Sequence, residues 1–293
     1  MEQPLLSNPN ISTTPCGSST TNSPTAESSP APSTTLTGLA FVVILASLSV
    51  WANLEAGKGF DISILNAAPA GTLAARRFDL LFVSNGRAAR ILLNASESVE
   101  RILYPNELYP RKPVRSVTLR LASHDLSEAV TLSHGDDPHL PGDFVIHVSP
   151  SVIAEADPGS ALASAVQRAM SRVWLWDGGG VAPKWLVDAM VEYLSSSAGF
   201  ASDDAVPLRS GGSCWGEEDP ASVARFFKYC EERRRGFVAR LNRAMRKHWN
   251  EMMVDVALGS SSQRLCLAYL TRPRQRGEVS GSTRSVLGLS QAM

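Results

Sequence analysis

The hydrophobic period of the chain changes at Pro150, and no other feature constrains the fold as strongly. Before Pro150, apolar and polar side chains alternate over short segments, as they do in β-strands. After Pro150, apolar residues recur at helical spacing. Three of the alternating segments are FDISILN at 60–66, VRSVTLRLA at 114–122 and DFVIHVSP at 143–150. This order of elements predicts an α+β domain in which a mixed sheet precedes a helical half.

Other segments complete the predicted domain, which spans residues 60–270. RFDLLFVS at 77–84 and EAVTLSHG at 128–135 are predicted as further strands. The segment 86–105 carries apolar residues at helical spacing, so one helix is predicted among the strands. In the second half, Ser160 precedes an alanine-rich run and is the predicted N-terminal cap of a helix.

A charge-free segment, LTGLAFVVILASLSVWANL, occupies residues 36–54. At about 1.5 Å per helical residue it nearly spans a hydrocarbon core, and Trp51 fits an interfacial anchor. We predict one transmembrane helix, which makes the chain a single-pass membrane protein with the membrane as a partner. A signal peptide cleaved after Ala52, which would leave the protein secreted, and a buried core helix are the alternatives.

Two polar tails flank these parts. Residues 1–35 consist mainly of Ser, Thr, Pro and Asn, and residues 271–293 are polar with Pro and Gly. Such segments bury too little apolar surface to offset their ordering entropy, so both tails are predicted to be disordered. Within the domain, Asn94-Ala95-Ser96 is a candidate glycosylation sequon that matters only if the domain is lumenal.

The charge balance and the cysteines narrow the choice of partners. The 28 Lys and Arg residues match 28 Asp and Glu residues, so no excess of cations is available to release counterions and no nucleic-acid partner is predicted. The four cysteines form no C-x-x-C pair, which leaves no visible cysteine zinc site. Cys214 and Cys230 would form a disulfide in an oxidising compartment or remain thiols, and the sequence leaves both open.

Several longer motifs occur along the chain in a recognisable order. Together, the segments from about Phe60 to Tyr269 resemble the plant basic secretory protein family, also called peptidases of plants and bacteria. The resemblance implies a zincin-like single domain, a zinc cofactor and peptidase activity. The segments that carry it are RKPVRSVTLRL at 111–121, GDFVIHVSPSVI at 142–153, VWLWDGGG at 173–180, APKWLVDAMVEYLSSSAGF at 182–200 and VARFFKYCEERRRGFVARLNRAMR at 223–246.

The metal motif of that family is degenerate in this chain. The resemblance aligns its His-Glu-x-x-His motif with Arg168-Ala169-Met170-Ser171-Arg172, and its downstream carboxylates with Asp188 and Glu192. Arginine has no lone pair for zinc and stays protonated, and alanine cannot act as the general base. None of the five histidines shows the i, i+4 spacing that would replace the motif. We therefore expect no catalytic residue, no metal ligand and no zinc.

The charged residues at these positions predict a different arrangement. Arg168 and Arg172 share one helical face, as do Asp188 and Glu192. We expect Arg172 to pair with Asp188 and Arg168 with Glu192 across the position of the metal. Solvated arginines on an open groove are the alternative.

These observations predict a membrane-anchored, catalytically inactive member of the family that binds a peptide or protein in its groove. A hydrolase with a rearranged active site, defence-related as the resemblance implies, is one alternative. A purely structural membrane protein is the other.

Overall fold

The computed structural model describes residues 38–46, 59–135, 142–200, 214–215 and 219–272. The chain divides into two compact units, Met1–Ala56 and Gly57–Met293.

In the first unit, residues 38–46 form a helix. No helix in the described part of the chain has both the length and the apolarity needed to cross a membrane. The rest of the predicted span at 36–54 lies outside the described residues, as do residues 1–35 and 273–293 of the predicted tails.

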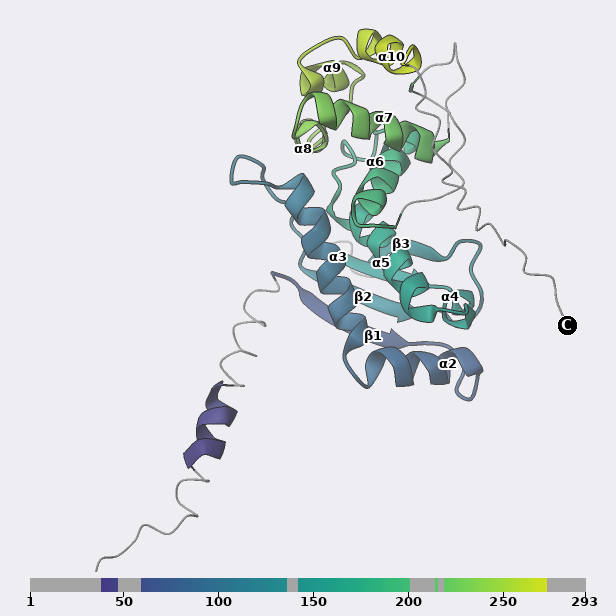
Figure 1. Ribbon diagram of the computed structural model, residues 1–293. Coiled ribbons are helices and arrows are strands. Elements are labelled where there is room, and N and C mark those ends of the chain that lie inside the picture. The colour runs from purple at the N-terminus through teal and green to yellow at the C-terminus, as the bar shows by residue number, and fades with distance from the viewer. Residues whose placement is uncertain (1–37, 47–58, 136–141, 201–213, 216–218, 273–293) are drawn as a thin grey trace, which may run out of the picture. The chain divides into compact units, whose positions relative to one another are not determined.

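The second unit contains a four-stranded mixed sheet with the order β1-β2-β4-β3 (Figure 1). The first three strands in this order are parallel, and β3 lies at one edge, antiparallel to β4. This sheet and the helices that follow it confirm the predicted α+β class. The strands are β1 (Asp61–Asn66), β2 (Ser116–Leu121), β3 (Val130–His134) and β4 (Asp143–Val148).

The alternation in the sequence matches the burial of the strands. In β2, Val117, Leu119 and Leu121 are fully buried, whereas Arg120 between them is exposed. Because side chains point alternately to opposite faces of a strand, one face of the sheet faces the core and the other remains polar.

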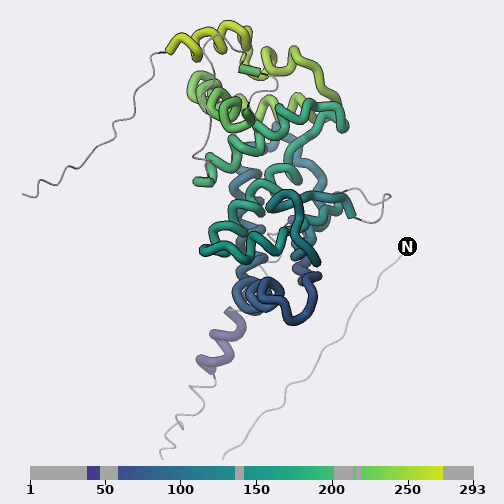
Figure 2. The backbone as a smooth tube through the Cα atoms, turned by 90° about the vertical axis from the view of Figure 1, so that its right-hand side faces the viewer, coloured from purple at the N-terminus to yellow at the C-terminus, as the bar shows by residue number. Residues whose placement is uncertain are grey.

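Two long helices, α3 (Arg87–Leu103) and α5 (Pro158–Trp174), pack against each other and against the sheet (Figure 1). The helix predicted at 86–105 is therefore confirmed as α3. In both views, α7 to α10 gather at one end of this unit and α2 lies at the other (Figures 1 and 2). The other helices are α2 (Leu73–Phe78), the π-helix η1 (Asp79–Val83), α4 (Pro150–Ala154), α6 (Lys184–Ser197), α7 (Pro220–Arg233), α8 (Phe237–Ala244), α9 (Met252–Leu258) and α10 (Ser262–Leu270).

The strand predicted at 77–84 is wrong, because this segment is helical in α2 and η1. Phe78 and Phe82 are both fully buried, and their ring centroids lie 6.0 Å apart. Leu80, which a strand would place on the same face, is 71% exposed. The buried residues thus follow the four-residue spacing of a helix.

The predicted cap at Ser160 is also wrong. Helix α5 begins two residues earlier, with Pro158 in its first turn and Asp157 as its N-cap. The Asp157 carboxylate accepts hydrogen bonds from the backbone N–H groups of Gly159 and Ser160, at 3.0 and 3.2 Å. An aspartate followed by proline fits this position at least as well as serine.

The cysteines pair differently from the arrangement considered above. Cys214 forms a disulfide with Cys266 of α10, and their Cα atoms are 5.7 Å apart. Cys230 is a free thiol that faces the core from α7. Burial, reinforced by the nearby Glu231 carboxylate, raises the pKa of the Cys230 thiol to about 12. Cys230 is therefore a packing residue.

Candidate functional site

Helix α5 presents its two arginines to α6 from a firmly packed helix. Its residues Ala169, Met170 and Val173 are buried in the core. The side chains of Arg168 and Arg172, four residues apart, are each about one third exposed, at 32% and 33%. The sequence therefore separates an apolar face, which fixes the helix, from a cationic face, which reaches the neighbouring helix.

The carboxyl end of α5 is held by two side chains from the first half of the domain. The Tyr104 hydroxyl donates to the Trp174 carbonyl at 2.6 Å, and Lys112 Nζ donates to the Leu175 carbonyl at 2.8 Å. Burial raises the pKa of Tyr104 to about 12 and lowers the pKa of Lys112. These donors satisfy carbonyls that the end of a helix leaves without partners, so the end of α5 is tied to the segment between α3 and β2.

The structure brings together all four charged residues singled out in the sequence. Arg168 Nη1 donates to Glu192 Oε2, and Arg168 Nη2 lies 3.4 Å from Glu192 Oε1. Arg172 Nη2 donates to Asp188 Oδ1 at 2.9 Å. Both pairs join α5 to α6 in the combination that the sequence analysis expected.

A fifth residue, Lys184, completes this cluster. Its Nζ donates to the second oxygen of Asp188. The Asp188 side chain is 16% exposed, and burial alone would raise its pKa, but the hydrogen bonds from Lys184 and Arg172 outweigh burial and hold the pKa below 3.8. Sequence reasoning missed Lys184, although its position four residues before Asp188 is a helical ion-pair spacing.

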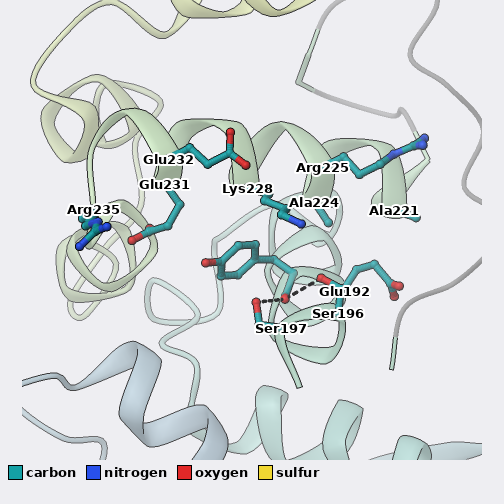
Figure 3. Close-up of a pocket in the computed structure, with 11 residues that line it drawn as sticks. Glu192, Ser196, Ser197, Ala221, Ala224, Arg225, Lys228, Glu231, Glu232 and Arg235 are labelled. Atoms are coloured by element: carbon teal, nitrogen blue, oxygen red, sulfur yellow. Dashed lines mark hydrogen bonds between the residues drawn. The ribbon is translucent and has the colours of Figure 1, made fainter. Parts of the chain in front are cut away.

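A hollow beside this cluster lies between α6 and α7 and has a volume of about 880 Å³ (Figure 3). Glu192 and Tyr193 of α6 line one side, and Lys228 extends from α7 toward α6. A second hollow of about 570 Å³ is lined by α4, the start of α5 and Arg168. Each member of the Arg168–Glu192 pair thus contributes to the wall of a different hollow.

Comparison with known proteins adds the family. Residues 57–269 match the model of the family described as peptidase of plants and bacteria. The chain belongs to that family. No curated protein and no solved structure matches the chain significantly. The match covers the sheet and nearly all of the helical half, which confirms the resemblance drawn from the sequence.

The donor set of this family member does not fit the zinc ion that the resemblance implies. Arg168 and Arg172 offer hydrogen-bond donors and no free lone pair. The carboxylates of Asp188 and Glu192 already accept bonds from cations. Within the described ranges, no group of three or more His, Cys, Asp or Glu residues could hold a metal ion.

Two hydroxyl residues near the cluster have structural partners. Ser171 is fully buried and donates to the Gln167 carbonyl at 2.8 Å. Asn94 of the glycosylation sequon is exposed on α3, whereas Ser96 is 2% exposed and accepts a hydrogen bond from Trp174 Nε1 at 2.8 Å.

Proposed function

We propose that this member of the peptidase family binds a peptide and has lost metal-dependent hydrolysis. The observation that carries the proposal is the pairing of Arg168 with Glu192 and of Arg172 with Asp188. In the register of the resemblance, 168, 172 and 188 are the positions of the metal ligands. Here ion pairs supply the link between the two helices that a shared metal would supply.

Electrostatics supports the loss of hydrolysis. Two guanidinium groups on one face repel a divalent cation, and their carboxylate partners have no uncompensated charge to attract it. Ala169 stands at the position of the general base and is 1% exposed. A methyl group cannot remove a proton from water, so the cluster lacks both parts of metal-assisted hydrolysis.

The hollow between α6 and α7 is the proposed peptide site, because some of its charged side chains have partners within the fold and others do not. Glu192 is paired with Arg168, and Glu231 accepts the backbone N–H groups of Gly236 and Val238 at the start of α8. Among the described residues, the side chains of Lys228 and Arg235 have no anionic partner. Lys228 points into the hollow (Figure 3). Glu231 and Glu232 also lack a cationic partner among the described residues, but the Glu231 carboxylate is engaged by the start of α8. Lys228 is therefore the cation left to face the hollow, and we propose a peptide with acidic side chains.

We further propose that the domain has a zincin-like fold and that residues 36–54 anchor it in a membrane. The family membership supports the first proposal, and the charge-free sequence of that segment supports the second.

Hydrolysis is tested with the full-length protein and a mixture of fluorogenic peptides, in the presence of zinc and with or without a chelator. The proposal expects no cleavage that depends on the chelator. Cleavage that zinc supports and the chelator stops would instead favour a peptidase with a rearranged active site.

Peptide binding is tested by fluorescence anisotropy with acidic, neutral and basic peptides of equal length. The acidic peptides should bind best, and K228E should weaken them about tenfold or more. The matched control is R76E, because Arg76 is an exposed cation on α2 at the other end of the unit. Equal binding of all three peptide classes would contradict the proposal of an acidic peptide ligand. The proposal that hydrolysis is lost would be unaffected.

A further inference from the structure

We propose that the carboxyl end of α8 and the turn after it form a binding site for an oxyanion, the phosphate or sulfate group of a ligand. A hollow of about 210 Å³ lies there, lined by Pro110, Arg243, Ala244, Arg246, Lys247 and His248. Three of these residues are permanent cations and none is a carboxylate. This hollow shares no lining residue with the proposed peptide site, so the inference is independent of the proposed function.

Aromatic rings hold the two arginines of this site. The guanidinium carbon of Arg243 lies 5.7 Å from the ring centroid of Tyr109, and that of Arg246 lies 5.8 Å from the ring of Trp176. Such cation–π contacts orient a guanidinium without using its N–H donors. In the described part of the chain, neither side chain donates a hydrogen bond or forms an ion pair, so their donors remain available to a ligand.

Arg240, one turn earlier on α8, shows what a structural arginine looks like in the same helix. Its Nε donates to the Ala257 carbonyl at 2.8 Å, and its two Nη atoms donate to the carbonyls of Arg235 and Arg234. All three nitrogens of Arg240 therefore hold the backbone together. Arg240 therefore stabilises the fold, whereas Arg243 and Arg246 are held in place by aromatic rings and keep their N–H donors free for a ligand.

A tight backbone contact fixes the segment that carries these cations. Gly178 has φ +67°, and a Cβ at this position would lie 2.9 Å from the Cβ of Trp249. The Trp176 backbone N–H donates to Asn242 Oδ1 at 2.9 Å. The glycine turn after α5 thus packs directly on the turn after α8, and a side chain on Gly178 would push the two apart.

No carboxylate among the lining residues compensates these cations. The carboxyl end of α8 contributes roughly half a negative charge, against three permanent positive charges. Asp177 of the adjacent turn accepts the Gly179 N–H, and its charge acts on Lys112. Glu100 pairs with Arg111 at 3.1 Å. Neither carboxylate lines the hollow, in whose wall Arg243, Arg246 and Lys247 carry positive charge.

The chemistry of the donors identifies the ligand class. Guanidinium groups bind phosphate and sulfate oxygens through two parallel N–H bonds, and lysine adds a point charge. The hollow is too small for an extended chain but holds one such group with part of its substituent. A soluble phosphate compound and an anionic lipid headgroup both present this chemistry.

The test uses the full-length protein with two probes. One is inorganic pyrophosphate, measured by calorimetry and by tryptophan fluorescence, because Trp176 lies under Arg246. The other is phosphatidylcholine vesicles with and without phosphatidylinositol phosphate. Pyrophosphate binding indicates a soluble ligand, and binding only to vesicles that contain the phosphorylated lipid indicates a headgroup.

The variants R243Q/R246Q and R243K/R246K distinguish recognition from general charge. We expect R243Q/R246Q to weaken binding at least about tenfold, and the lysine variant to lie between it and the wild type because it lacks the fork. The control R76Q/R101Q removes two exposed arginines elsewhere and should bind like the wild type. The inference fails if neither probe binds, or if R243Q/R246Q and the control affect binding equally.

Discussion

Two pairs of arginines in this domain have the same chemistry and opposite surroundings. Arg168 and Arg172 of α5 are paired with carboxylates of α6. Arg243 and Arg246 at the end of α8 lie against aromatic rings. The first pair is internally neutralised and links two helices, whereas the second is oriented by the fold and left charged. An arginine paired with a carboxylate of the fold has a structural role, whereas an arginine held only by an aromatic ring keeps its charge for binding.

The largest effect on stability is expected when one member of an ion pair between α5 and α6 is removed. R168A leaves the Glu192 carboxylate, 9% exposed, without its cation. We expect the free energy of unfolding to fall by about 2 kcal/mol, since a partly buried unpaired charge is costly. Urea denaturation measures this value. The double variant R168M/E192L should recover most of the loss, and a double variant as unstable as R168A would mean that the pair does not act as a unit.

The next largest effect is a loss of stability at acid pH that is caused by protonation of Asp188. Because the pKa of Asp188 in the folded state lies below its ordinary value of 3.8, its contribution is complete above that value. It is lost as the pH falls from there toward the lower folded pKa, since protonation releases Arg172 and Lys184. We expect a loss on the order of 1 kcal/mol in urea titrations at acid pH. D188N should flatten this part of the profile, and an unchanged slope would contradict the assignment.

A modest effect on stability is expected where the effect on ligand binding is largest. R243Q/R246Q should lower the free energy of unfolding by about 0.5–1 kcal/mol, because it removes exposed cation–π contacts but leaves no buried carboxylate without a partner. The measurement is urea denaturation beside R168A under the same conditions. Destabilisation comparable with that of R168A would erase the contrast between the two arginine pairs.

A smaller effect is expected at Lys184, whose side chain is 85% exposed. K184A should cost only about 0.3 kcal/mol, because exposed helical ion pairs are weak. The thermal midpoint of this variant should lie close to that of the wild type. A loss as large as that of R168A would mean that Lys184 is a principal partner of the cluster.

The features that sequence predicted were those with a clear local period. The alternation of β2 and β4 and the helical spacing of α3 fixed their type, because each pattern extends over the whole element. The strand prediction for 77–84 failed because the segment fits two patterns. Phe78, Leu80 and Phe82 have the two-residue spacing of a strand face, and Phe78 and Phe82 alone have the four-residue spacing of a helix face. Only the burial of both phenylalanines, with Leu80 exposed, separates the two patterns.

The site was predictable where the family register supplied the geometry. The family alignment placed the helical face of Arg168 and Arg172 opposite the face of Asp188 and Glu192, and the ion-pair partners followed from that placement. The Cys214–Cys266 disulfide and the contact of Arg243 with Tyr109 join residues far apart in the sequence. Such contacts depend on tertiary packing, which no local pattern contains.

The zinc content of the full-length protein tests the central claim most directly. After incubation with zinc and removal of free metal, elemental analysis should find no stoichiometric zinc in the wild type. The variant R168H/R172H should bind about one ion per chain, because it places two imidazoles at helical spacing beside Asp188. One tightly held zinc ion per wild-type chain, lost from D188N/E192Q, would contradict the account.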